Sequence, residues 1–114
     1  KLDEIDAIVG FGNGDADTDS LELDAYRKLF GGKLASLPVF TVKDTTGEGR
    51  AASASLSAAH AALMLSDKYE LAGRAYKLQA DKMVQTTVDT KALKNVLVTS
   101  YGVGGSYCAV IIKR

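Results

Sequence analysis

The stretch that decides the fold is residues 5–22, which read IDAIVGFGNGDADTDSLE. Its opening IDAIVGF is short, apolar and interrupted near its end by glycine, which is typical of a buried strand. The following GNGDADTDS has the Gly, Asp and Asn content of a loop. Asp19 or Ser20 is then the expected cap of a helix that ends at the glycines 31–32. We expect this helix to bury the apolar residues that recur at helical spacing, namely Leu21, Ala25, Leu29 and Phe30.

The rest of the chain continues this order of strands and helices. Residues 37–42 (LPVFTV) predict a second strand, 43–50 a polar loop and 51–65 a buried, alanine-rich helix. Residues 66–92 are ambiguous: 70–84 has weak helical spacing interrupted by a glycine, and VQTTVD alternates like a strand. Finally, 95–100 and 107–113 are β-rich runs around GVGG and predict a hairpin. The sequence therefore predicts a layered α/β domain, β-α-β-α followed by a β-hairpin, with both βα loops at the carboxyl edge of the sheet.

The totals fit one small domain and disfavour several functions. The chain has 114 residues, with 14 Lys plus Arg against 14 Asp plus Glu, so there is no electrostatic case for binding nucleic acid or an anionic membrane. One cysteine and one histidine argue against a disulfide or a zinc site, and we expect neither metal nor cofactor. No apolar run predicts a membrane span or signal peptide, and the lone cysteine fits the cytoplasm. Because the chain begins at Lys1, we expect a piece of a longer or processed protein.

Residues 11–22 carry the first of three similarities to one family. In FGNGDADTDSLE, the residues Gly12, Gly14, Asp19 and Glu22 stand where β-ketoacyl synthases have Gly, Gly, Asp and Glu around a His-Gly-Thr-Gly-Thr loop. Phe11 stands at the position of that family's first catalytic histidine. The chain thus resembles the C-terminal portion of a β-ketoacyl synthase, a condensing enzyme with the thiolase fold.

The second similarity is VKDTTGEGRAASASLSAA, beside the family's Lys-Ser-x-x-Gly-His and its small-residue helix. Lys43 and Gly47 match, whereas Glu48 stands at the position of the second catalytic histidine. Ser57 replaces a helix glutamate that pairs with the lysine in the family.

The third similarity is TSYGVGGSY, which resembles the family's Asn-Ser-Phe-Gly-Phe-Gly-Gly hairpin. Val103 replaces the second Phe, which gates the acyl pocket in the family, so we expect a roomier pocket. The matching residues are Ser100, Gly102, Gly104 and Gly105.

The resemblance implies a chemistry that this chain has lost. The family condenses an acyl thioester on a Cys nucleophile, in the N-terminal half, with a malonyl thioester, and its two histidines stabilise the enolate oxygen. Such an oxygen needs hydrogen-bond donors, but Phe11 has none and an ionised Glu48 only accepts. We therefore expect a non-catalytic subunit of the chain-length-factor type, which pairs with a ketosynthase and shapes an acyl pocket. The pocket residues implied by the resemblance are Phe11, Asn13, Thr46, Gly102, Val103 and Gly104.

Two other functions stay open. The chain could be the C-terminal part of a divergent synthase, an acyltransferase whose Cys lies on another chain, in which Lys43 and Thr46 matter and Glu48 is an acid or base. It could also be a plain interaction domain in which Phe11 fills the pocket.

The remaining reactive side chains have simpler interpretations. We expect Cys108 to be a buried packing residue and His60 to be structural, on a helix edge. Lys43 is expected to form an ion pair, with Asp15, Asp44 or Glu48 as its partner. The aspartates 15, 17 and 19 lack the spacing of a calcium loop.

The strand count also predicts an association. We expect residues 1–114 to form a single thiolase-like half domain that lacks the first strand and helix of that half, which would leave an unpaired edge and an uncovered face. We therefore expect the domain to be incomplete alone and to pair with itself or with a thiolase-fold chain, either a ketosynthase or an N-terminal half. The resemblance also implies acyl carrier protein as a partner.

Overall fold

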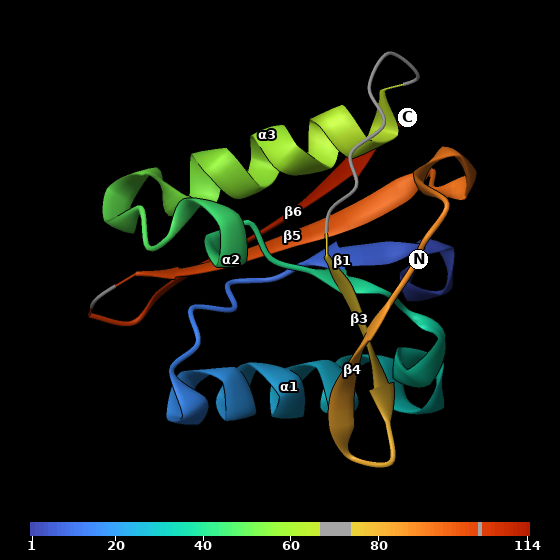
Figure 1. Cartoon of the computed structure of the whole chain (residues 1–114), viewed down its shortest axis with the longest axis horizontal. Helices are drawn as coiled ribbons and strands as arrows, with labels where there is room; N and C mark the ends of the chain where they lie inside the picture. Colours follow the sequence, from blue (N-terminus) through green and yellow to red (C-terminus); the bar gives the residue numbers. More distant parts are fainter. Residues whose placement is uncertain (67–73, 103) are drawn as a thin grey trace.

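A mixed six-stranded sheet organises the fold, with the strand order β4-β3-β2-β1-β5-β6. The computed structural model describes residues 1–66, 74–102 and 104–114. Helix α3 lies on one face of the sheet and helix α1 on the other, so the domain has three layers (Figure 1). The layered α/β class predicted from the sequence is confirmed.

The strands β1 and β2 are short and central, and β1 is parallel to both β2 and β5. The remaining pairs, β2–β3, β3–β4 and β5–β6, are antiparallel. The strands are β1 (Ala7–Val9), β2 (Val39–Phe40), β3 (Ala75–Gln79), β4 (Lys82–Thr86), β5 (Asn95–Gly102) and β6 (Ser106–Lys113). The helices are α1 (Ala16–Phe30), α2 (Lys43–Thr46) and α3 (Ser53–Leu65), with 3-10 turns at Leu2–Glu4, Gly31–Ser36, Arg50–Ala52 and Thr90–Ala92.

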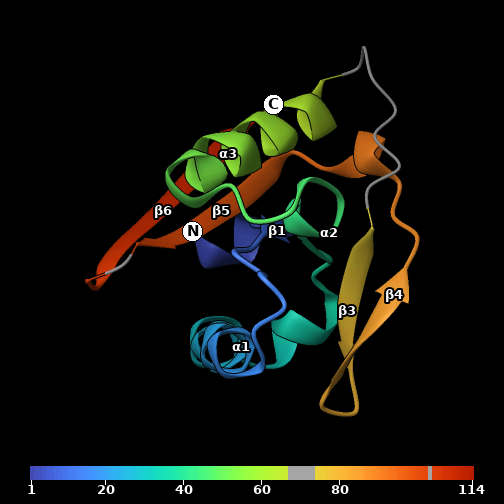
Figure 2. The ribbon, with the colours of Figure 1, turned by 60° about the vertical axis from the view of Figure 1, so that its left-hand side comes forward.

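Alternate residues of the central strands bury opposite faces, as the period of two of a strand requires. On the α3 side, Val9 and Phe40 join Ala61, Met64, Val96 and Val98 in one apolar cluster. On the α1 side, Ile8 and Leu97 join Tyr26, Phe30, Leu34 and Leu37 in a second cluster. Figure 2 shows the two helices on either side of the sheet, with the β3–β4 hairpin extending it at one edge.

Helix α1 begins earlier and faces the sheet differently from what its sequence predicts. Its cap is Asp15, whose carboxylate accepts a hydrogen bond from the Thr18 amide at 3.0 Å, and not Asp19 or Ser20. The helix buries Glu22, Tyr26 and Phe30, while the predicted apolar residues Leu21 and Leu29 are 71% and 46% exposed, and Ala25 is exposed as well. The helix presents Glu22 to the sheet in place of Leu21, because the Glu22 carboxylate accepts hydrogen bonds from the Phe11 and Gly12 amides there.

The ambiguous region contains a hairpin, so the helical interpretation of 70–84 is wrong for its described residues. β3 and β4 pair across a two-residue turn at Ala80 and Asp81, which have φ of +46° and +64°. Two left-handed residues in succession make a turn whose twist matches the flanking strands. Residues 67–73, with the predicted glycine interruption, lie outside the described residues.

The other predicted elements are confirmed with shifted ends. β1, β2, α3 and the β5–β6 hairpin lie within or around their predicted ranges. The predicted polar loop 43–50 contains the one-turn helix α2, and six strands replace the four that the sequence indicated. None of the helices among the described residues combines the length and apolar character needed to cross a bilayer.

Candidate functional site

The two βα loops meet at the carboxyl edge of the sheet, as parallel neighbouring strands require. The Thr41 hydroxyl, just after β2, donates to the Gly12 carbonyl at 2.9 Å, just after β1. Gly12 has φ of +34°, and a Cβ there would lie 3.0 Å from the Thr41 side chain. The glycine therefore permits the close approach of the two loops.

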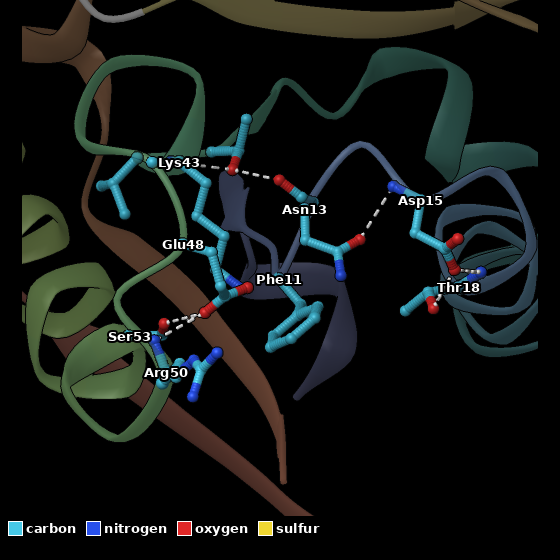
Figure 3. A network of polar contacts seen from close by, with 12 residues as sticks. Phe11, Asn13, Asp15, Thr18, Lys43, Glu48, Arg50 and Ser53 are labelled. Carbon is cyan, nitrogen blue, oxygen red and sulfur yellow. Dashed lines mark hydrogen bonds and ion pairs between the residues drawn. The ribbon is translucent and has the colours of Figure 1, made fainter. Parts of the chain in front are cut away.

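Three residues of the predicted site contact one another at this edge. The Lys43 Nζ lies 3.0 Å from the centre of the Phe11 ring and 2.8 Å from the Glu48 Oε2 atom. Figure 3 shows the lysine and the glutamate meeting beside the phenylalanine. The Lys43 side chain is only 4% exposed, so its charge is balanced by a carboxylate and an aromatic face in place of water. Of the three partners expected for Lys43, the structure selects Glu48.

Glu48 is held by more than the lysine. Its Oε1 atom accepts hydrogen bonds from the Ser53 hydroxyl and the Arg50 amide, each at 2.7 Å. The Lys43 ammonium and the Ser53 hydroxyl together lower the pKa of Glu48 to about 2. The carboxylate is thus ionised near neutral pH and offers only acceptors, which are already occupied by these three donors.

Glu22 is the residue that holds the first loop in place, a role the sequence did not indicate. It is 6% exposed and accepts from the Phe11 amide at 2.8 Å and the Gly12 amide at 3.1 Å. The Tyr26 and Thr99 hydroxyls also donate to it, at 2.6 and 3.1 Å. A single buried carboxylate therefore joins α1, the loop after β1 and strand β5. Its matched position in the family loop was the available signal, but its partners are distant in sequence.

An aromatic series extends the site to the C-terminal hairpin. The Phe11 and Tyr101 ring centres are 5.1 Å apart, and those of Tyr101 and Tyr107 are 5.6 Å apart. Burial is the main cause that raises the pKa of Tyr101, so its hydroxyl is neutral across the physiological range. The Phe11 ring thus packs between Lys43 and Tyr101 of β5, so its loop is held by contacts on both sides.

The other predicted pocket residues lie around this network without closing on it. Asn13 is exposed and its Oδ1 accepts from the Asp15 amide at 3.0 Å (Figure 3). Thr46 is exposed, and its hydroxyl donates to the Val42 carbonyl at 3.1 Å. Gly102 and Gly104 are exposed at the hairpin turn, where Gly104 has φ of +90°. Val103 lies outside the described residues.

Cys108 and His60 lie away from this network. Cys108 is exposed on β6, so its expected burial is wrong: β6 is an edge strand, and the sequence pattern alone does not distinguish an edge from a centre. His60 packs on the Phe40 ring, with centres 6.2 Å apart, which agrees with a structural role, and burial lowers its pKa. Within the described ranges, no group of three or more His, Cys, Asp or Glu side chains is arranged to hold a metal ion.

The arrangement limits the chemistry at this edge. Phe11 presents no hydrogen-bond donor, Glu48 presents bonded acceptors, and the Lys43 ammonium is already paired. Stabilising a developing oxyanion requires free donors aimed at it. The chain's one histidine, His60, lies in α3. The Lys43, Glu48 and Phe11 side chains therefore contact one another and groups of their own loops.

Comparison with known proteins gives a family for most of the chain. The model of the family described as beta-ketoacyl synthase, C-terminal domain, matches residues 1–77, which include Phe11, Lys43 and Glu48 and exclude the β5–β6 hairpin. Searches of curated proteins and of solved structures find no significant match. Because the match covers more than half of the 114 residues, the chain belongs to the β-ketoacyl synthase C-terminal domain family.

Proposed function

We propose that this chain is a non-catalytic β-ketoacyl-synthase-like subunit of the chain-length-factor type. It would pair with a ketosynthase and help to shape the pocket for an acyl or polyketide chain. The family assignment supports the condensing-enzyme context, and the residues at the two loop positions support the loss of catalysis.

The observation that carries the proposal is the pairing of Lys43 with Glu48 over the Phe11 ring. The side chains at the two positions aligned with the family's histidines, Phe11 and Glu48, both contact the Lys43 ammonium. Loss of one oxyanion donor commonly slows such reactions by about 100-fold or more. Loss of two, with a carboxylate added, leaves no means of stabilising the enolate at these positions.

The exposed surface supports a partner. Strand β6 is an edge, and its Tyr107, Val110 and Ile111 are 79%, 47% and 48% exposed. Long apolar edge strands favour pairing with another chain. Partners that would suit this edge are a ketosynthase, a chain with an N-terminal thiolase half or a second copy, with acyl carrier protein binding to the assembled pair.

The test begins with the intact masses of all polypeptides that purify with the chain, before and after incubation with an acyl thioester. We expect the acyl adduct on a partner's cysteine and none on Cys108. The variant Cys108→Ser is the matched control for this assignment. An adduct on Cys108 that disappears in the variant would contradict a non-catalytic subunit.

The same complex separates the proposal from a divergent two-chain synthase. The Thr46→Val variant removes an exposed hydroxyl whose side-chain contact is with its own helix, so the domain should stay folded. If the chain is non-catalytic, malonyl decarboxylation by the complex should keep its rate in Thr46→Val and in Glu48→Gln. A loss of ten-fold or more in both variants, with assembly intact, would favour the divergent synthase.

Light scattering of the isolated chain tests the incomplete domain. We expect a dimer or larger species at micromolar concentration. A monomer that unfolds cooperatively in urea would overturn this part of the proposal.

A further inference from the structure

Strand β6 has a row of backbone donors and acceptors that point away from the sheet. Among the described residues it pairs with β5 alone, in an unbroken register. The Arg114 amide continues this ladder and donates to the Lys94 carbonyl at 2.9 Å. Because hydrogen-bonded and non-hydrogen-bonded positions alternate in an antiparallel pair, the even-numbered residues of β6 bond to β5. The residues that direct their backbone groups to the open edge are Tyr107, Ala109, Ile111 and Lys113.

This edge lacks the features that usually prevent strands from pairing. Natural edge strands are commonly short, charged or interrupted by proline. Strand β6 has 8 residues, and 106–112 contain neither a charge nor a proline. The opposite edge, β4, has 5 residues and begins with Lys82. Of the two edges, β6 is therefore the one suited to a further strand.

The surface beside this edge is also free of charge. Helix α3 lies over β5 and β6 (Figure 2) and contains no Asp, Glu, Lys or Arg residue. Its Leu56 and Leu63 are 39% and 40% exposed. On β6, Val110 lies on the α3 face, because its partner Val98 belongs to the apolar cluster on that face. Two copies that meet at this edge thus bring no like charges together beside α3.

A two-fold axis perpendicular to the sheet restricts which residues can face each other. Residues directly opposite in an antiparallel pair share a face of the sheet, so a strand paired with its own copy has a residue at the axis. With Val110 at the axis, Ala109 faces Ile111 of the second copy, and Tyr107 faces Lys113. All four of these residues direct their backbone groups to the open edge. Centring the pair on Ala109 would instead place Lys113 opposite the hairpin turn, so the Val110 register uses more of the strand.

We propose that two copies of this chain pair antiparallel through β6, with Val110 at the two-fold axis, to form one continuous sheet. Lys113, the one charged residue of the strand, then faces the Tyr107 ring of the second copy, and the two lysines lie at opposite ends of the interface. The inference rests on the association in the function proposed above and adds the partner, the strand and the register. The loss of catalysis does not depend on it.

Amide hydrogen exchange of the unaltered chain, followed by NMR, tests the pairing. Sedimentation identifies one protein concentration at which the chain is monomeric and one at which it is dimeric. We expect the amides of Tyr107, Ala109, Ile111 and Lys113 to exchange rapidly in the monomer and about ten-fold more slowly, or slower still, in the dimer. The amides of 108, 110 and 112 bond to β5 and should be protected in both states.

Two results of this experiment would overturn the inference. A chain that stays monomeric at millimolar concentration would overturn it together with the association proposed above. A dimer in which the amides of 107, 109, 111 and 113 still exchange rapidly would overturn it alone, because association would then use another surface. The acyl-adduct test of the non-catalytic role is independent of both results.

Two variants at one position identify the interface. Ala109→Pro removes an N–H group that faces the open edge, and edge strands tolerate proline at such a position. The domain should stay folded, and its dimer should weaken by about ten-fold or more. Ala109→Thr is the matched control, because it keeps the N–H group and should keep the dimer. A folded Ala109→Pro variant that dimerises as well as Ala109→Thr would contradict pairing through β6.

Cysteine cross-linking tests the register. In a Cys108→Ser background, Val110→Cys places two thiols opposite each other at the axis, at a non-hydrogen-bonded pair with Cα atoms about 4.5 Å apart, within the range of a disulfide. Mild oxidation should therefore give a disulfide-linked dimer. Ala109→Cys in the same background faces Ile111 and should cross-link about ten-fold more slowly or less. Equal cross-linking of both variants, or none of Val110→Cys, would show that Val110 does not lie at the axis.

Discussion

Glu22 offers the sharpest test of the physical account, because one side chain joins three elements. The substitution Glu22→Gln keeps the shape of the side chain and removes its charge. In the native domain one carboxylate oxygen accepts from the Phe11 amide and two hydroxyls, and the other accepts from the Gly12 amide at 3.1 Å. A glutamine has one acceptor oxygen, so its amide nitrogen must face a donor on one side.

The expected cost follows from these contacts. If the glutamine NH₂ group faces the Gly12 amide, two donors meet and a buried group has no acceptor, which costs about 1–3 kcal/mol. The bonds that remain become neutral, and hydrogen bonds to charged groups exceed neutral ones by about 1 kcal/mol. Removing an ionised carboxylate from a buried site offsets part of this loss. We therefore expect Glu22→Gln to lower the free energy of unfolding by about 2 kcal/mol.

The assay is urea unfolding followed by circular dichroism at one fixed protein concentration, since association would otherwise shift the midpoint. Asp17→Asn is the control: it changes an exposed acid of the same helix and should alter stability by less than about 0.5 kcal/mol. Tyr26→Phe removes one donor to Glu22 and should cost about 1 kcal/mol. A Glu22→Gln variant as stable as Asp17→Asn would refute the role of Glu22 as the loop's anchor.

Three further perturbations address the site and the hairpin. The pKa of Glu48 falls from 4.5 to about 2 on folding, so its ion pair stabilises the domain above pH 4.5 and that contribution is lost as the pH falls toward 2. In Glu48→Gln the free energy of unfolding, measured in urea, should vary less across this window, and an unchanged pH profile would contradict the ion pair. Phe11→Leu keeps an apolar residue but removes the ring face from Lys43, and it should cost about 1 kcal/mol by the same assay; no loss would mean that the cation–ring contact contributes nothing. Ala80→Gly relieves a left-handed alanine and should raise stability by about 0.5 kcal/mol, whereas Gln79→Gly, in the adjoining strand, should lower it.

The predictable parts of the fold are those with strong local signals. The apolar run of β1, the alanine-rich α3 and the β-rich runs around GVGG each contain enough information within a few residues. The β3–β4 hairpin lacks such a local signal, because its turn uses Ala80 and Asp81 in place of the Asn-Gly or Asp-Gly that usually marks a two-residue turn.

Helix α1 shows why its buried face could not be predicted. Apolar spacing favours Leu21, Ala25, Leu29 and Phe30, and of these four Phe30 alone is buried. The other buried residues of the helix are Glu22 and Tyr26. The difference depends on the Phe11 and Gly12 amides and the Thr99 hydroxyl, which a glutamate can satisfy only from the sheet side. Hydrophobic periodicity assumes that a buried position is apolar, and a bonded buried carboxylate is the exception that it misses.

The substitutions at the loop site are best understood as one electrostatic adjustment. The resemblance of the second loop to the family implies that Lys43 corresponds to a lysine paired by a glutamate of the following helix, at the position that holds Ser57 here. Ser57 is buried at 3% exposure, so without another acid the Lys43 ammonium would be buried and unpaired, a costly state. Glu48 supplies that acid from the loop, and the Phe11 ring covers the ammonium. The resemblance places these two residues at the positions of the family's histidines. We infer that the retained lysine and the absent histidines are linked. The carboxylate that α3 lacks is supplied by Glu48, at a position where the family's reaction needs a hydrogen-bond donor. Restoring a histidine at position 48 alone would therefore leave Lys43 without its counter-ion.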